Sequence, residues 1–258
     1  MLTTRCATAL FALLLPLLTG AGAVPTGAES GAGAGPAAGP LQEPAGRPPA
    51  RNGRIVQATS TNWSGYAVSG GHYSSVSAHW VQPAARCSRA TSYASFWIGL
   101  DGDGSHSVEQ TGTETDCSGG APMSYAWYEM YPAYPVVLPH PVRAGDRISA
   151  SVTGTAAGAF TLVLSDATAH WSETVRRSLP GATRASAEVI AEAPSGSAGV
   201  LPLTDFGTAA FTGATVNGRP LAALATERIT MASGPAVLAT ASALAGGGGN
   251  FAVTWRRG

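Results

Sequence analysis

More than ten short segments with the composition of β-strands follow one another from about residue 57 to the end of this 258-residue chain. They are rich in β-branched and aromatic residues, and turn-forming pairs such as Gly70-Gly71 and Asn217-Gly218 separate them. No window carries the sustained apolar repeat of a long helix, which recurs roughly every 3.6 residues. The expected strands are Trp63–Ser69, Tyr73–Gln82, Ala94–Leu100, Ser124–Tyr131, Arg147–Gly154, Ala159–Ser165, Thr168–Val175, Ala187–Glu192, Thr208–Thr212, Glu227–Met231 and Asn250–Trp255. Such a series predicts an all-β fold, an antiparallel β-sandwich of two sheets.

The first 56 residues differ in composition from this region. Arg5 and the apolar run Ala9–Leu18 precede a small-residue cleavage site, which is the pattern of a secretory signal peptide over residues 1–23. Residues 24–56 are rich in Gly, Ala and Pro and lack aromatic side chains, so they predict a linker or a short propeptide. We therefore expect a secreted, extracellular protein with one folded domain at 57–258 and no membrane contact after signal cleavage.

Export also determines whether the cysteines can form a disulfide. Cys6 leaves with the signal peptide, so Cys87 and Cys117 remain in an oxidising compartment. The simplest outcome is one disulfide, which closes a loop of about 30 residues and contributes roughly 3 kcal/mol in the chain-entropy account. The pair lacks the spacing of a zinc site.

The charge composition excludes several classes of function. The formal net charge is zero and only 12% of the residues are charged, whereas nucleic-acid-binding proteins usually show a basic excess. All 15 basic residues are Arg, so mechanisms that need a catalytic lysine are excluded. The run Asp101–Gly104 hints at a calcium loop, but Gly112 stands where an EF-hand needs an acid, so we expect a plain turn. We expect no nucleic acid, no metal ion and no other cofactor.

Aromatic and acidic residues gather on a few of the expected strands. Trp127, Glu129 and Tyr131 alternate along one segment, so their side chains point to the same face of a strand. Glu188 and Glu192, four residues apart, also share a face. In the simplest structural interpretation the tryptophans fill a sandwich core and the acids face solvent. A strand face that carries both Trp and Glu argues against a purely structural core.

Seven sequence blocks, in order, resemble those of the glutamic peptidases, also called the eqolisin family. The blocks are TNWSGYAV, HWVQP, FWIGLDGDG, EQTGTE, AWYEMYP, AEVIAEAP and LTDFGTAAFTGATVNG, and they span Asn62 to about Gly218. The resemblance implies a lectin-like sandwich of two antiparallel sheets with about seven strands each. It also implies an endopeptidase that is active in acid and uses a catalytic Gln/Glu dyad. The matching positions are Gln110 and Glu188 for the dyad, and Trp97, Asp101, Trp127, Glu129 and Tyr131 for the substrate cleft.

The implied roles agree with the chemistry of these side chains. Glu188 can act as general base toward water and later return the proton to the leaving amine. The amide of Gln110 can stabilise the tetrahedral oxyanion. We therefore expect a monomeric, pepstatin-insensitive peptidase that acts on proteins or peptides. Val189 and Met130 stand where the family commonly has Trp, and we expect these changes to bear on the shape of the cleft.

Two other classes of function also fit the residues. A glycoside hydrolase would use two carboxyl groups across an aromatic cleft, with Glu129 and Glu188 as candidates, and would not need Gln110. A non-catalytic carbohydrate- or protein-binding module would use the tryptophans as stacking platforms, and no single acid would matter.

Overall fold

Residues 55–258 are described by the structure, which is a computed structural model. The predicted signal peptide (1–23) and residues 24–54 of the predicted linker lie outside the described residues. The first strand, β1 (Ile55–Ser60), begins two residues before the predicted start of the domain. Apart from the short 3-10 helices η1 (Leu221–Ala223) and η2 (Gly246–Gly248), the regular elements of this region are strands. Neither helix in it is long or apolar enough to cross a membrane.

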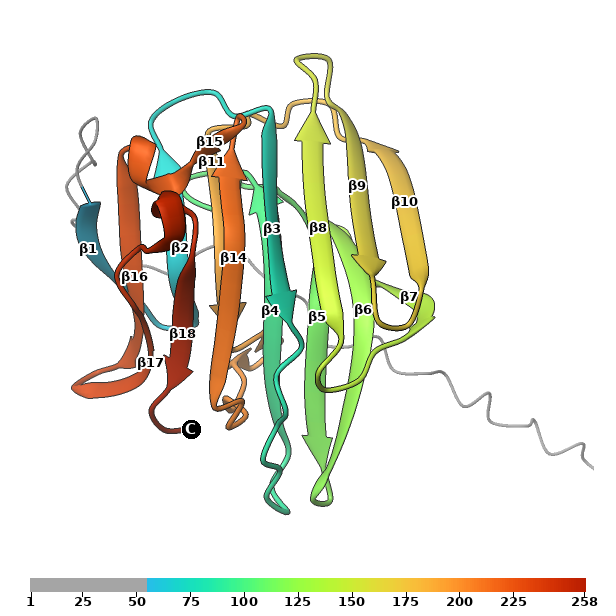
Figure 1. The fold of residues 1–258 in the computed structure, drawn as a ribbon, viewed down its shortest axis with the longest axis vertical. Helices are drawn as coiled ribbons and strands as arrows, with labels where there is room; N and C mark the ends of the chain where they lie inside the picture. Colours follow the sequence, from blue (N-terminus) through green and yellow to red (C-terminus); the bar gives the residue numbers. More distant parts are fainter. Residues whose placement is uncertain (1–54) are drawn as a thin grey trace, which may run out of the picture. The chain divides into compact units, whose positions relative to one another are not determined.

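The main strands form one continuous hydrogen-bonded path that folds into two layers of seven, which confirms the predicted all-β sandwich (Figure 1). The first layer runs through β7 (Val136–Pro141), β6 (Ala121–Tyr131), β5 (Val108–Ser118), β4 (Ser92–Leu100), β11 (Ser186–Glu192), β2 (Trp63–Ser69) and β16 (Thr226–Ser233). The second layer continues through β17 (Ala236–Ala241), β18 (Phe251–Trp255), β14 (Thr208–Val216), β3 (Ser75–Val81), β8 (Arg147–Gly154), β9 (Ala159–Asp166) and β10 (Trp171–Ser178).

The strand pairing differs from two separate antiparallel sheets in two respects. β16 pairs with β17 of the other layer, so the ladder is continuous along that side of the sandwich. β1 pairs with β16 in the parallel direction. Of the shortest strands, β15 (Arg219–Pro220) pairs with β14, while β12 (Ser195–Gly196) and β13 (Gly199–Val200) form a separate hairpin.

The sequence predicts some strands better than others. β2 and β8 have the predicted bounds. β1, β5, β7 and β17 are missing from the prediction. β5 is almost entirely polar, β7 contains two prolines and β17 consists mostly of small residues. β10 begins at Trp171 instead of Thr168, because Asp166 Oδ1 accepts hydrogen bonds from the N–H groups of Thr168 and Ala169 and forms a turn there.

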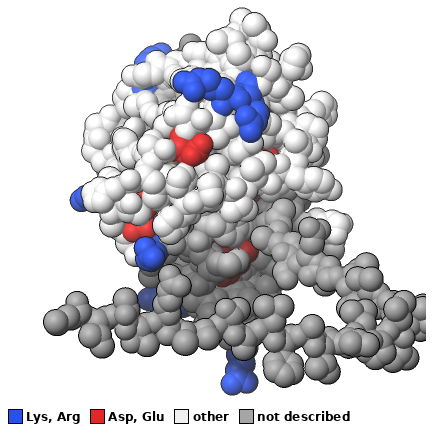
Figure 2. Space-filling model, turned by 90° about the vertical axis from the view of Figure 1, so that its right-hand side faces the viewer, with Lys and Arg blue, Asp and Glu red and all other residues white. Residues whose placement is uncertain are grey.

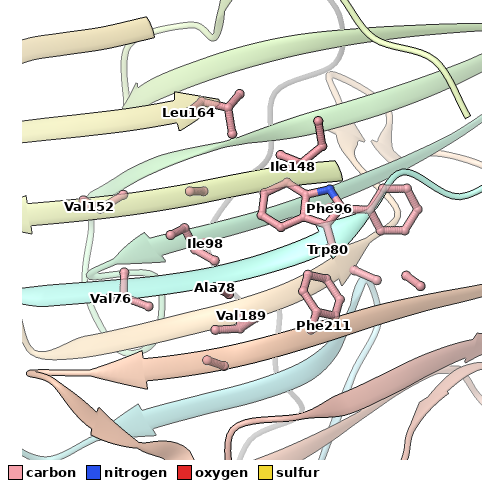
Figure 3. Close-up of a cluster of buried hydrophobic side chains, with 14 of the residues drawn as sticks. Val76, Ala78, Trp80, Phe96, Ile98, Ile148, Val152, Leu164, Val189 and Phe211 are labelled. Carbon is pink, nitrogen blue, oxygen red and sulfur yellow. The ribbon is translucent and has the colours of Figure 1, made fainter. Parts of the chain in front are cut away.

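The main core lies between the two layers (Figure 3). β4 contributes Phe96 and Ile98, and β3 contributes Val76 and Trp80, none of them more than 2% exposed. Each such side chain contributes roughly 1.5–3 kcal/mol through burial. Trp80 Nε1 donates a hydrogen bond of 3.0 Å to Thr113 Oγ1 on β5, so its polar atom is satisfied inside the core.

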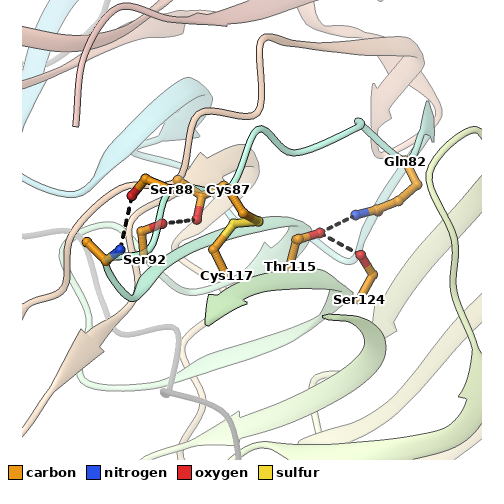
Figure 4. The surroundings of a disulfide bond; sticks show 9 residues. Gln82, Cys87, Ser88, Ser92, Thr115, Cys117 and Ser124 are labelled. Atoms are coloured by element: carbon orange, nitrogen blue, oxygen red, sulfur yellow. Dashed lines mark hydrogen bonds between the residues drawn. A yellow bond between two sulfur atoms is a disulfide. The ribbon is translucent and has the colours of Figure 1, made fainter. Parts of the chain in front are cut away.

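Cys87 and Cys117 form the predicted disulfide (Figure 4). Their Cα atoms are 5.3 Å apart and the two residues are 30 positions apart in the chain. Nearby, Gln82 Nε2 donates to Thr115 Oγ1 at 2.9 Å, and Thr115 is hydrogen-bonded to Ser124. The bridge thus ties the β3–β4 connection to the end of β5, the strand that carries Gln110.

β7 and β10 are the two ends of the strand path, and their side chains meet. The rings of His140 on β7 and Trp171 on β10 stack with centroids 4.7 Å apart and planes 7° apart. Trp171 Nε1 donates to the carbonyl oxygen of Pro141, and His140 Nε2 lies 3.0 Å from Glu173 Oε2. These contacts nearly close the sandwich into a barrel. Figure 2 views the molecule from this side and shows that uncharged side chains dominate its described surface.

Candidate active site

One cross-strand row on the outer face of the first layer contains both residues of the predicted dyad. From β16 to β6 the row consists of Glu227, Ala67, Glu188, Gly99, Gln110 and Glu129. Residues directly opposite on neighbouring strands project from the same face of a sheet. A single strand, β4, separates Glu188 from Gln110, which puts their Cα atoms about 9–10 Å apart by strand spacing.

The residue between the two dyad positions is a glycine. A Cβ atom on Gly99 would lie 3.0 Å from Gln110 Cβ and 3.1 Å from Trp97 Cζ3, which is closer than ordinary van der Waals contact. A side chain at position 99 would therefore press against Gln110 and Trp97, so glycine suits the place between the two predicted dyad residues.

An apolar row lies next to the polar one, two residues along each strand. It contains Ala58, Ile229, Gly65, Ile190, Trp97, Gly112, Trp127 and Val137. Trp97 and Trp127 belong to this outer cluster and not to the core between the layers, so they do not fill the sandwich core. Gly112 lies between them, and a Cβ there would come 2.6 Å from Trp97 Cβ.

Gln110 is oriented by the acid beside it. Its Nε2 donates a hydrogen bond of 2.6 Å to Glu129 Oε2, and both residues are fully buried. Burial raises the pKa of Glu129 to about 8, although the hydrogen bond from Gln110 opposes the shift. Glu129 is therefore a neutral carboxyl group under acidic conditions.

Glu188 is held by the loop that follows β4. The backbone N–H of Asp103 donates to Glu188 Oε1 at 3.2 Å and to Ser186 Oγ at 2.9 Å. Burial raises the pKa of Glu188 well above its usual value, and the charge of Asp103 raises it further. Hydrogen bonds from Ser186 and from the N–H groups of Gly102 and Asp103 act in the opposite direction. Glu188 Oε2 is buried and has no hydrogen-bond partner among the described residues.

Asp101 directly follows β4 and anchors the connection between β10 and β11. It adopts a positive φ of 73°, and its carboxyl group accepts hydrogen bonds from Thr183 Oγ1 and from the N–H groups of Arg184 and Ala185, at 2.6 to 2.8 Å. Asp101 thus fixes the β10–β11 connection that leads into the strand of Glu188. Its side chain is turned to that loop and is fully buried.

The other predicted site residues come together on one face. Trp97, Trp127 and Tyr131 belong to or pack against the outer cluster, whereas Tyr128 and Met130 on the same strand as Trp127 face the core. This confirms the predicted alternation along β6. The residues on the shared face are Trp97, Gln110, Trp127, Glu129, Tyr131 and Glu188.

Comparison with protein families gives the same classification. The sequence model of the peptidase A4 family matches residues 61–255. The chain belongs to the peptidase A4 family. Membership confirms the glutamic endopeptidase class that the seven sequence blocks imply, and it favours a peptidase over the glycoside hydrolase and the binding module. Among curated protein sequences, none matches this chain.

Solved glutamic peptidases share the fold of this A4 peptidase. A scytalido-glutamic peptidase with a transition state analog inhibitor aligns with a TM-score of 0.67 and 23% identity, over 76% of this chain and 98% of that chain. An eqolisin-family peptidase in a complex with the tripeptide Ala-Ile-His gives 0.63 and 22%, with the same coverage. The aspergilloglutamic peptidase from Aspergillus niger gives 0.56 and 25%, over 64% and 99%.

Two departures of this A4 peptidase from the family pattern do not lie in the cleft. Val189 and Met130 point into the core between the layers, because each follows a cleft-facing residue and side chains alternate along a strand. Figure 3 shows Val189 among the core side chains. Neither side chain therefore lies on the face that carries Gln110 and Glu188.

Several residues of the site were not predicted. Trp63 packs edge-on against Trp97, with centroids 4.9 Å apart and planes at 75°. A Cβ on Gly102 would lie 2.5 Å from Trp63 Cη2 and 3.2 Å from Glu188 Cδ. Glu192 accepts a hydrogen bond of 2.7 Å from Trp97 Nε1. The sequence contains a signal for two of them, since Trp63 lies in the first sequence block and Glu192 shares a strand face with Glu188. The contacts of Trp63 and Glu192 cannot be predicted without the fold.

A cavity of about 470 Å³ opens between the β4–β5 loop and the β10–β11 connection. Its wall includes His106 from the β4–β5 loop, Pro132 after β6, and Leu179 and Ala185 from the β10–β11 connection. The loop that holds Glu188 thus also borders the cavity.

Proposed function

We propose that this protein is a secreted endopeptidase that hydrolyses peptide bonds at acidic pH through Gln110 and Glu188. The observation that carries the proposal is the row in which Gly99 alone separates these two residues. Membership of the A4 family supports a peptide or protein substrate. Secretion rests on the signal pattern of residues 1–23.

Glu188 acts as general base and then as general acid. Its ionised carboxylate takes a proton from water as the water oxygen bonds to the scissile carbonyl carbon, and the proton then passes to the nitrogen as the C–N bond breaks. The raised pKa suits the second step, because the carboxyl group holds the proton until the amine leaves. Protonated Glu188 cannot act as a base, so activity in acid requires the hydrogen bonds from Ser186, Gly102 and Asp103 to keep part of Glu188 ionised against the effect of burial.

Gln110 stabilises the oxyanion that forms in the first step. An amide NH₂ has two donor hydrogens, and one is directed to Glu129. We assign the donor role toward the oxyanion to this NH₂ group. Donors of this kind are worth roughly 10²–10³ in kcat. Because glutamine does not titrate, acidic conditions leave this donor intact.

The surrounding side chains form the substrate cleft in this proposal. Trp97, Trp127 and Tyr131 line the face on either side of the dyad, and Asp101 fixes the loop above it. The cavity beside the β4–β5 loop has room for a substrate side chain. The dyad contains no pair of aspartates, so we expect pepstatin not to inhibit the enzyme. The protein acts as a monomer.

The test compares the secreted full chain with Gln110→Ala and Glu188→Gln, using a denatured protein substrate from strongly acidic to neutral pH with pepstatin present. Two matched controls alter a buried glutamine and a buried glutamate that face the core, Gln82→Ala and Glu109→Gln. We expect both dyad variants to be folded and inactive, and both controls to retain activity. A folded wild type without activity at any pH would overturn the proposal. Full activity of Gln110→Ala would overturn the dyad.

A further inference from the structure

We propose that Glu192 is a positioning residue that fixes the indole ring of Trp97 against Gly99, the residue between Glu188 and Gln110. Glu192 does not touch the reacting atoms and acts through Trp97. The inference rests on the proposed peptidase function and deepens it.

The carboxyl group of Glu192 is held on both of its oxygens. Oε2 accepts the hydrogen bond of 2.7 Å from Trp97 Nε1, and Oε1 accepts one of 3.1 Å from Asn62 Nδ2. Asn62 Oδ1 in turn accepts a hydrogen bond from Ser60 Oγ at 3.0 Å. All four residues are fully buried. Because hydrogen bonds strengthen away from water, this series of hydrogen bonds gives the indole ring one preferred orientation.

The orientation of Trp97 matters because its ring reaches the dyad. Glu192 is paired with Ser95, two residues beyond the apolar row and away from the dyad, and its hydrogen bond holds the nitrogen side of the indole. The opposite, benzo side leans along β4 toward Gly99. There Trp97 Cζ3 and Gln110 Cβ lie 3.1 and 3.0 Å from the position that a Cβ on Gly99 would take. The benzo side of the ring thus lies against Gly99, next to the Cβ atom of Gln110.

A second set of contacts links Trp97 to the loop over Glu188. Trp63 packs edge-on against Trp97, and Trp63 Cη2 lies against Gly102. Gly102 in turn borders the Glu188 carboxyl group and precedes Asp103, whose N–H binds it. A rotation of Trp97 would therefore disturb the surroundings of both dyad residues. A purely structural buried acid would have no such connection.

The test is a double-mutant cycle on the full chain with Glu192→Ala, Trp97→Phe and both changes together, assayed for kcat and KM on one peptide. We expect Glu192→Ala to lower kcat about ten- to a hundredfold with a smaller change in KM, because misplaced catalytic geometry costs that much. The double variant should be no slower than Trp97→Phe alone. Glu192→Gln keeps an acceptor for the indole N–H, so we expect it to stay within about threefold of wild type.

Gln82→Ala serves as the matched control, because it removes a buried side-chain network between the end of β3 and the core-facing side of β5, away from the face of the dyad. Thermal unfolding of each variant, with assays well below its midpoint, separates lost structure from lost positioning. Losses from Glu192→Ala and Trp97→Phe that simply add, in an active enzyme, would overturn the positioning role alone. The same holds if Glu192→Ala slows kcat no more than Gln82→Ala does. A wild type that cleaves nothing would instead overturn the proposed function.

Discussion

Gln110 and Glu129 face each other directly across β5 and β6, and the amide of the first donates a 2.6 Å hydrogen bond to the carboxyl group of the second. The contact decides which way the amide points, with its nitrogen toward Glu129. The orientation of the proposed oxyanion donor is therefore set by the neighbouring acid.

We expect Glu129→Gln to keep most of the activity and Glu129→Ala to lose it. With its pKa raised to about 8 by burial, Glu129 is already a neutral acceptor at acidic pH, and glutamine reproduces its shape and its oxygen. Alanine removes the acceptor, and we expect kcat to fall about ten- to a hundredfold, or roughly 1.4–2.7 kcal/mol. Steady-state kinetics at acidic pH measure both. Equal rates for Glu129→Ala and wild type would show that Gln110 needs no partner.

Two substitutions should move the acidic limb of the pH profile in opposite directions. Ser186→Ala removes a hydrogen bond that lowers the pKa of Glu188, so the limb should move to higher pH. Asp103→Asn removes a negative charge that raises this pKa, so the limb should move to lower pH, while the Asp103 N–H remains in place. The pH dependence of kcat/KM reports the free enzyme and gives both shifts. Shifts in the same direction would mean that another group controls the limb.

The folded domain should lose stability as the pH rises from about 4.5 to about 8. Burial, with the Asp101 charge second, raises the pKa of Glu109 to about 8, and burial raises that of Glu129 to about 8 as well. Both shifts mean that the folded chain binds more protons than the unfolded chain over this range, so unfolding becomes easier by about 1.4 kcal/mol per pH unit for each group. Urea unfolding at a series of pH values measures this slope.

Glu109→Gln should make that slope shallower by about one proton. Thr113→Val, a neutral change on the same face of β5, provides the control, since it alters packing and a hydrogen bond without altering the proton balance. If the slope stays the same in Glu109→Gln, the buried carboxyl group of Glu109 does not drive the pH dependence.

Introducing the residue usual in the family at position 189 should destabilise this chain. Val189 is fully buried between the layers, and a tryptophan there would overpack the core, at a typical cost of about 1–3 kcal/mol. The dyad lies on the other face, so kcat per folded molecule should change little in Val189→Trp. Denaturant unfolding and active-site titration measure the two effects separately. A gain in stability would contradict the packing described for this core.

The fold could be predicted from the sequence where one face of a strand is apolar and the other polar. β5 shows why the prediction fails elsewhere. Its two faces carry Gln110 and Glu114 on one side and Thr113 and Thr115 on the other, and all four side chains are buried. A strand that buries polar groups on both faces has no alternation to detect, although this one carries half of the proposed dyad.

The residues of the proposed site could be named from the sequence blocks, but their geometry could not be predicted. Glu188 and Gln110 are about 80 residues apart in the chain, and only the pairing of both with β4 shows that Gly99 lies between them. The burial of Asp101 depends in the same way on the β10–β11 connection, which begins in the other layer. Cross-strand register and loop anchoring are long-range properties, and no local pattern encodes them.

The contact between His140 and Trp171 bears on how the protein behaves when it is concentrated. A chain with a formal net charge of zero at pH 7 has little electrostatic repulsion to keep its copies apart, and exposed strand edges are then the usual route to aggregation. Here the two terminal strands of the path are joined through side chains, and β7 carries Pro139 and Pro141, which cannot donate ladder hydrogen bonds. These two edges are therefore poor templates for strand addition, and the folded molecule resists fibre growth at this side.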